Sequence, residues 1–129
     1  MELRIDDSID NYLCFDLRDI LEIISEGDKY IWSIAMANFS PINDGLKNED
    51  WTFIEKINDS IDSYLISWTD LNYLANLNIQ TIDGIIKGKT IDDTIEINAF
   101  DSTYWTITTE NNNYIESIKK RFKSIRINK

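Results

Sequence analysis

The hydrophobic residues in the second half of the chain recur with a period close to two, and this pattern constrains the fold more than any other feature. It predicts three β-strands at residues 79–87, 94–100 and 104–109. The turn Asp101-Ser102-Thr103 would join the last two strands into a hairpin. Because hairpin strands pair antiparallel, this half of the chain is expected to form a mainly antiparallel sheet.

Helical periodicity elsewhere supplies elements that can cover such a sheet. The pattern predicts helices at residues 15–26, 50–63, 69–77 and 113–124, with Thr69 as the N-cap of the third. The positions expected to face the core are Leu17, Ile20, Leu21, Ile24, Phe53, Ile54, Ile57, Ile61, Leu71, Leu74, Ala75, Ile115, Ile118 and Phe122.

One further strand and one loop complete the prediction. Residues 30–37 alternate, and the buried side of this strand should carry Tyr30, Trp32, Ile34 and Met36. Residues 40–48 are rich in turn-forming residues and predict a loop. The expected fold is α+β: a single domain over residues 1–129 with a mainly antiparallel sheet of about four strands and three to four helices packed on it.

Acidic residues dominate almost the whole sequence. Residues 1–118 contain all 23 Asp and Glu residues but only 7 of the 13 Lys and Arg residues, and the chain has a formal net charge of −10 at pH 7. The other basic residues crowd the last eleven positions: Lys119, Lys120, Arg121, Lys123, Arg126 and Lys129. Coulomb repulsion disfavours binding to nucleic acids and anionic membranes. Coulomb attraction favours a basic protein as partner.

The residue types that usually carry catalysis are scarce. The chain has no histidine and one cysteine, Cys14, which lies in an apolar run and is predicted to be a buried, unreactive thiol. The N-terminal segment lacks the features of a secretory signal, and no apolar run approaches the ~20 residues of a membrane helix. These features predict a cytoplasmic binding protein without cofactor, metal or enzymatic activity.

Two motifs resemble ligand sites without completing them. The segment from Gly84 to Thr90 has three residues before its Gly-Lys-Thr end, where a phosphate-binding loop has four, so it is interpreted as a strand end and turn. The acidic clusters lack the glycine and the distal glutamate of a calcium-binding loop and are interpreted as solvated carboxylates. These clusters are Asp6, Asp7 and Asp10, and separately Asp92 and Asp93.

Two acidic stripes on predicted helices are the candidate binding surfaces. At about 100° per residue, each stripe falls opposite the apolar positions of its helix, and Trp51 lies near the second stripe. An aromatic residue ringed by carboxylates is typical of a binding hot spot, although a solvated helix surface is the alternative interpretation. The candidate residues are Asp19, Glu22 and Glu26 on the first helix and Trp51, Glu55, Asp59 and Asp62 on the second.

Three segments of the second half carry a family resemblance: residues 66–71 (Ile-Ser-Trp-Thr-Asp-Leu), the Asp83-Gly84 pair, and the hairpin from Ile95 to Ile107. Together they are similar to small bacterial immunity proteins of polymorphic-toxin and contact-dependent growth-inhibition systems. The resemblance implies a cytosolic, non-catalytic protein that covers a cognate toxin, often a basic nuclease. It assigns no toxin-contact residues.

The leading hypothesis is therefore an immunity protein that neutralises a cognate basic toxin by stoichiometric, charge-steered binding. A second hypothesis is another acidic inhibitor or adaptor, such as a nucleic-acid mimic that blocks a DNA-binding protein. A third is a carboxylate-based hydrolase, which would need a pocket with two carboxylates about 5–10 Å apart.

Overall fold

The computed structural model describes residues 1–42 and 45–128. Its strands are β1 (Glu2–Ile5), β2 (Ser8–Ile9), β3 (Tyr12–Leu13), β4 (Ile31–Pro41), β5 (Tyr64–Ile66), β6 (Ile79–Lys89), β7 (Thr94–Phe100), β8 (Tyr104–Thr108) and β9 (Ile125–Asn128). Its helices are α1 (Leu17–Leu21), α2 (Asn48–Asn58), α3 (Trp68–Ala75) and α4 (Asn112–Arg121), with a 3₁₀ turn, η1 (Gly27–Lys29). None of the described helices has the length and apolar character needed to cross a membrane.

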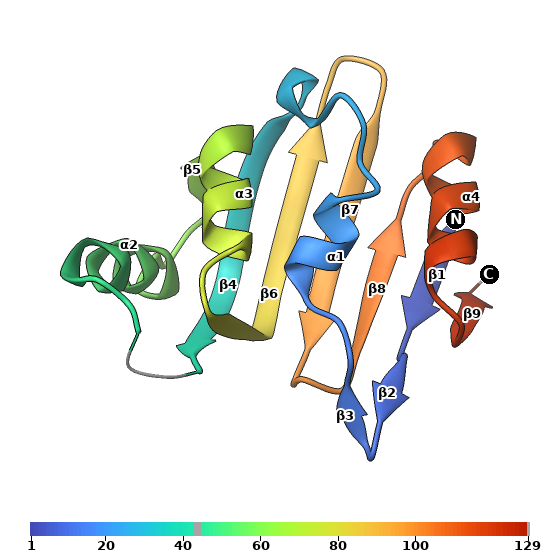
Figure 1. Cartoon of the computed structure of the whole chain (residues 1–129). Helices are drawn as coiled ribbons and strands as arrows, with labels where there is room; N and C mark the ends of the chain where they lie inside the picture. The colour runs from blue at the N-terminus through green and yellow to red at the C-terminus, as the bar shows by residue number, and fades with distance from the viewer. Residues whose placement is uncertain (43–44, 129) are drawn as a thin grey trace.

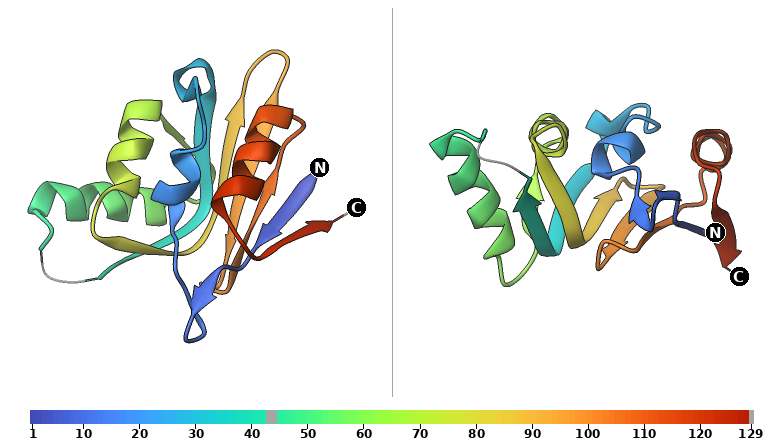
Figure 2. Two further views of the ribbon diagram at one scale, coloured as in Figure 1. Left: turned by 45° about the vertical axis from the view of Figure 1, so that its right-hand side comes forward. Right: turned by 60° about the horizontal axis from the view of Figure 1, so that its bottom comes forward.

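One antiparallel sheet organises the chain, in the order β5-β4-β6-β7-β8-β1-β9, while β2 and β3 form a separate small hairpin (Figure 1). The helices α1, α3 and α4 lie on one face of this sheet, and α2 lies beyond its β5 end (Figure 2). Most of the core lies between the sheet and these three helices, and Ile54 and Ile57 of α2 also belong to it. Its largest fully buried side chains are Trp32, Trp105 and Phe39.

No helix of the described chain covers the second face of the sheet (Figure 2). Alternation with the buried residues places polar and charged side chains on this face. In the strand register, Lys87 of β6 lies opposite Glu96 of β7, and Arg4 of β1 lies opposite Arg126 of β9. The Arg4 guanidinium lies 3.8 Å from the centre of the Tyr104 ring. Because cations and carboxylates are mixed on this face, it attracts a basic partner less than a purely acidic surface would.

The α+β class and the antiparallel pairing follow the prediction, but the expected number of about four strands was wrong, since the large sheet has seven strands and the hairpin two more. The missed strands are β1, β2, β3, β5 and β9, which are two to four residues long. β1 and β9 alternate over only four residues, the shortest run that indicates a strand, and β2, β3 and β5 are shorter still. The three strands predicted for residues 79–109 are present as β6, β7 and β8, and residues 101–103 connect β7 to β8.

The first helix is shorter than predicted. It ends at Leu21 because residues 22–26 turn toward η1, where Glu26 has a left-handed φ of 59°. Packing around Gly27 stabilises this turn. The Trp32 indole N–H donates to the Gly27 carbonyl at 2.7 Å, and a Cβ at Gly27 would lie 2.4 Å from the Trp68 ring. Leu17, Ile20, Leu21 and Ile24 are nevertheless all buried, as predicted.

Two residues predicted to be buried face solvent instead. Met36 is 74 % exposed because a β-bulge shifts the register of β4 against β6 between Ala35 and Asn38. Ile61 is 97 % exposed because α2 ends at Asn58 instead of continuing to residue 63. Both predictions assumed that the hydrophobic period continues, whereas the bulge interrupts it in β4 and the helix end interrupts it in α2.

The remaining predictions differ from the structure in smaller ways. The N-cap of α3 is Ser67 and not Thr69, since the Ser67 hydroxyl accepts the Asp70 N–H at 3.1 Å. Ser40 and Pro41 extend β4, so the predicted loop at residues 40–48 begins later, and Asn43 and Asp44 within it lie outside the described residues. The expected core residues of α3 and α4 are buried: Leu71, Leu74, Ala75, Ile115, Ile118 and Phe122.

Candidate functional site

The candidate binding surface is the outward side of α2. Residues 48–62 contain five acidic residues and one lysine. Glu49 and Asp50 occupy the first turn and Lys56 the last, which complements the helix dipole at both ends. Ile54 and Ile57 are buried and attach the helix to the body. The other side therefore projects past the sheet edge, away from the helices that cover the core (Figure 1).

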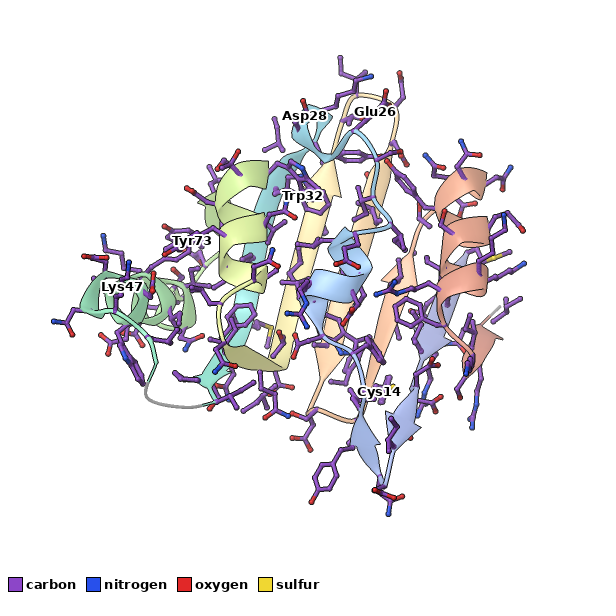
Figure 3. All side chains as sticks on the ribbon, viewed as in Figure 1. Cys14, Glu26, Asp28, Trp32, Lys47 and Tyr73 are labelled. Carbon is purple, nitrogen blue, oxygen red and sulfur yellow. The ribbon has the colours of Figure 1, made fainter. Side chains whose placement is uncertain are left out.

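A buried carboxylate attaches the start of α2 to α3. Asp50 is only 6 % exposed, and its Oδ1 accepts a hydrogen bond from the Tyr73 hydroxyl. Tyr73 extends between α3 and α2 (Figure 3), and its ring centre lies 6.2 Å from that of Phe53. Donation to Asp50 raises the pKa of the Tyr73 hydroxyl. The neutral Tyr73 hydroxyl stabilises the fold at every pH below the ordinary tyrosine pKa. This contribution is lost only as the pH rises through the raised pKa of the folded protein.

The end of α2 is attached to the outer edge of β4 by one side chain. The Asn58 amide accepts the Phe39 N–H at 2.9 Å and donates to the Phe39 carbonyl at 3.0 Å. These two bonds replace those that a neighbouring strand would make, because β5 pairs only with residues 32–34 of β4. Asn58 thereby both orients α2 and protects an exposed sheet edge.

Replacing Asn58 with alanine is expected to lower the free energy of unfolding by about 1–2 kcal/mol, because both backbone groups of Phe39 lose their partners. Urea unfolding followed by tryptophan fluorescence measures this change. The matched control is Asn76→Ala, since the Asn76 amide donates only to the Asn72 carbonyl of its own helix and is exposed. Equal effects of the two substitutions would contradict this role for Asn58.

The predicted residues of the second stripe reach solvent, although not as one continuous helical stripe. Trp51 is 37 % exposed, and the exposed Glu55 and Asp59 follow it by about one and two helical turns, with Asp59 as the C-cap of α2. Asp62 is exposed as well, but it lies in the turn before β5, so its predicted i+7 position on the helix was wrong. None of these three carboxylates forms an ion pair with a cation that the structure describes.

The first predicted stripe is not an open acidic surface. Arg121 of α4 binds Asp19 at 2.9 Å and Glu22 at 3.1 Å. Glu26 lies beyond α1 and pairs with Lys29 at 3.0 Å. The prediction considered α1 alone, whereas the fold places the basic end of α4 beside it. Since each of these carboxylates has a cation partner, they are weaker candidates than those of α2.

A cleft of about 640 Å³ lies beside α1, and both Asp16 and Asp19 line it. Its size is in the range of ligand pockets, so it bears on the hydrolase hypothesis. The Asp16 carboxylate accepts hydrogen bonds from the Leu17 N–H at 2.6 Å and from the N–H and hydroxyl of Thr81 at 3.0 and 2.6 Å. Asp19 accepts the Asp16 N–H at 3.0 Å, which completes a capping box. These bonds give both carboxylates a role in capping α1 and joining it to β6.

Cys14 lines the same cleft and is exposed, which contradicts the predicted buried thiol. It follows the two-residue strand β3, next to the small hairpin (Figure 3), whose apolar residues Ile9 and Tyr12 are also exposed. Among residues 1–42 and 45–128, no group of three or more Cys, Asp or Glu side chains is arranged to hold a metal ion.

Sequence reasoning found the exposed residues of α2 but missed the contacts that position them. Asn58 has no sequence signal beyond its place near the helix end, and the Asp50–Tyr73 contact joins residues 23 positions apart. No protein-family model, curated protein or solved structure matches the chain.

Proposed function

We propose that this chain is a cytoplasmic, immunity-type protein that binds and neutralises a basic toxin domain, with a nuclease as the favoured partner class. The observation that carries the proposal is the projecting side of α2, where the exposed Trp51 is followed one turn later by Glu55 and two turns later by Asp59, both without a cation partner among the described residues. Aromatic anchors contribute strongly to interfaces, and carboxylates attract a basic surface that normally receives a phosphodiester.

The distribution of charge supports this choice of surface. The uncovered face of the sheet mixes the cations Arg4, Lys87 and Arg126 with the carboxylates of Glu2 and Glu96, while the carboxylates of α1 are paired with cations. The α2 side combines net negative charge with solvent access and a large aromatic side chain. Binding there would need no rearrangement of the core, because Ile54 and Ile57 already attach the helix.

Co-expression with the product of the reading frame immediately upstream tests the proposal. The expected result is a 1:1 complex that co-purifies, removes the toxicity of that product and associates more slowly as salt is raised. A product that is not toxic, or that does not co-purify at low salt, would overturn the proposed function.

A further inference from the structure

Residues 58–66 run along the outer edge of β4 and are fixed to it at both ends. Asn58 binds the backbone of Phe39 at one end. At the other end β5 pairs antiparallel with β4, with Tyr64 opposite Ile34 and Ile66 opposite Trp32. The pairing with β4 ends at Tyr64 and Ile34, so residues 59–63 span the stretch of β4 between Ile34 and Phe39, which contains the bulge. The two attachments therefore hold the Ile61 turn beside the bulge of β4.

Two large apolar side chains face solvent along this edge, and we call them the edge patch: Met36 at 74 % and Ile61 at 97 % exposure. Periodicity predicted both of them to be buried. Met36 has a left-handed φ of 52° in the middle of a strand, a conformation unfavourable for a methionine. The bulge thus turns an apolar side chain outward at some cost, and Met36 does not belong to the core.

Carboxylates adjoin the edge patch. Asp59 and Asp62 flank Ile61 in the sequence, both are exposed, and neither pairs with a cation of the described residues. Glu55 lies one turn earlier on α2. A second copy of this chain is a poor occupant, because a two-fold contact would bring two sets of these carboxylates together. Charge complementarity instead favours a partner with cationic side chains around an apolar one.

We propose that the edge patch is the apolar centre of the partner-binding surface, and that the partner inserts an apolar side chain flanked by lysine or arginine. This inference rests on the proposed function and extends its interface from α2 to the β4–β5 edge. The carboxylates would supply steering, while burial of Met36 and Ile61 would supply affinity that salt does not remove. The partner's apolar side chain would contact Ile61 first, since that residue is the more exposed of the two.

Two short peptides test the inference without the natural partner. The probes are Lys-Lys-Leu-Lys-Lys and Lys-Lys-Ser-Lys-Lys, titrated into ¹⁵N-labelled protein at about 0.15 M salt, where distant charges are screened. The leucine peptide is expected to bind about fivefold more tightly than the serine peptide. Its amide shifts should concentrate at residue 36 and residues 59–66.

The double variant Met36→Asn with Ile61→Ser should remove the preference for leucine and leave binding of the serine peptide unchanged. Asparagine tolerates the left-handed conformation, so the melting temperature of this variant should not be lower than that of the natural protein. It should be a few degrees higher if the strain at Met36 is relieved. The matched control is Ile9→Ser with Ile91→Ser, which removes two exposed isoleucines elsewhere, at 67 % and 102 % exposure.

Each outcome decides the matter. Any of three results overturns the inference: equal binding of the two peptides, leucine-specific shifts outside the β4–β5 edge, or an equal effect of the control variant. The proposed function still stands in these cases if the serine peptide shifts the amides of Glu55 and Asp59. No shift from either peptide overturns the inference and removes the electrostatic support for the proposed function. Self-association of the natural protein that the double variant abolishes would assign the edge patch to a second copy and overturn the partner stated here.

Discussion

The triple substitution Glu55→Lys, Asp59→Lys and Asp62→Lys is expected to weaken binding of the basic partner by roughly 100-fold. Each change replaces an attraction with a repulsion at the surface where the partner is proposed to dock. All three side chains are exposed and lack described cation partners, so the fold should be retained. Calorimetry measures the affinity, and rapid mixing should show that the association rate falls and loses most of its dependence on salt.

A control with the same change in net charge separates local from global electrostatics. Asp28→Lys, Asp92→Lys and Glu116→Lys alter exposed carboxylates on η1, on the β6–β7 turn and on α4. This variant should lose affinity by less than about tenfold, because screening limits charges more than a Debye length away. Equal losses in the two variants would mean that only total charge matters, and would exclude α2 as the specific surface.

Replacing Trp32 with alanine is expected to lower the free energy of unfolding by about 3–5 kcal/mol, the usual cost of removing a large buried aromatic side chain. Trp32 is 1 % exposed and stacks on Trp68 with ring centres 5.3 Å apart. Its indole N–H also holds the Gly27 carbonyl. The substitution would therefore leave a cavity and detach both η1 and α3 from the sheet. Urea or thermal unfolding measures the loss.

Trp32→Phe distinguishes packing from the hydrogen bond. It keeps an aromatic ring against Trp68 but leaves the Gly27 carbonyl without its donor, so the expected loss is smaller, about 1–3 kcal/mol. If Trp32→Ala cost less than Trp32→Phe, the assignment of Trp32 to the core would be wrong. Neither variant should change the partner affinity of the fraction that remains folded, since Trp32 does not reach the surface of α2.

The sequence predicted elements well where a period extends over several residues. The strands β6, β7 and β8 and the buried residues of α3 and α4 follow from alternation and helical spacing alone. The short strands β1, β5 and β9 depend on pairing with residues far along the chain, as when β1 at the N-terminus pairs with β8 and β9. Local propensity cannot indicate such pairing, so the sheet was predicted with too few strands.

In the candidate site, too, features set by local spacing could be predicted, and features set by tertiary contacts could not. Trp51, Glu55 and Asp59 could be placed on one side of a helix from spacing alone, and the structure keeps them exposed. Arg121 reaches the carboxylates of α1 only through the tertiary fold, so their neutralisation could not be foreseen. Met36 and Ile61 were misplaced because a bulge and an early helix end interrupt their periods. These interruptions are also what bring the edge patch to the surface.

Hydrogen–deuterium exchange of the complex with the upstream gene product tests whether α2 and the β4–β5 edge form the binding surface. Complex formation is expected to slow exchange in residues 48–66 and around residue 36, while the strands β7, β8 and β1 keep the exchange of the free protein. Protection confined to the uncovered face of the sheet, with residues 48–66 unchanged, would contradict this expectation.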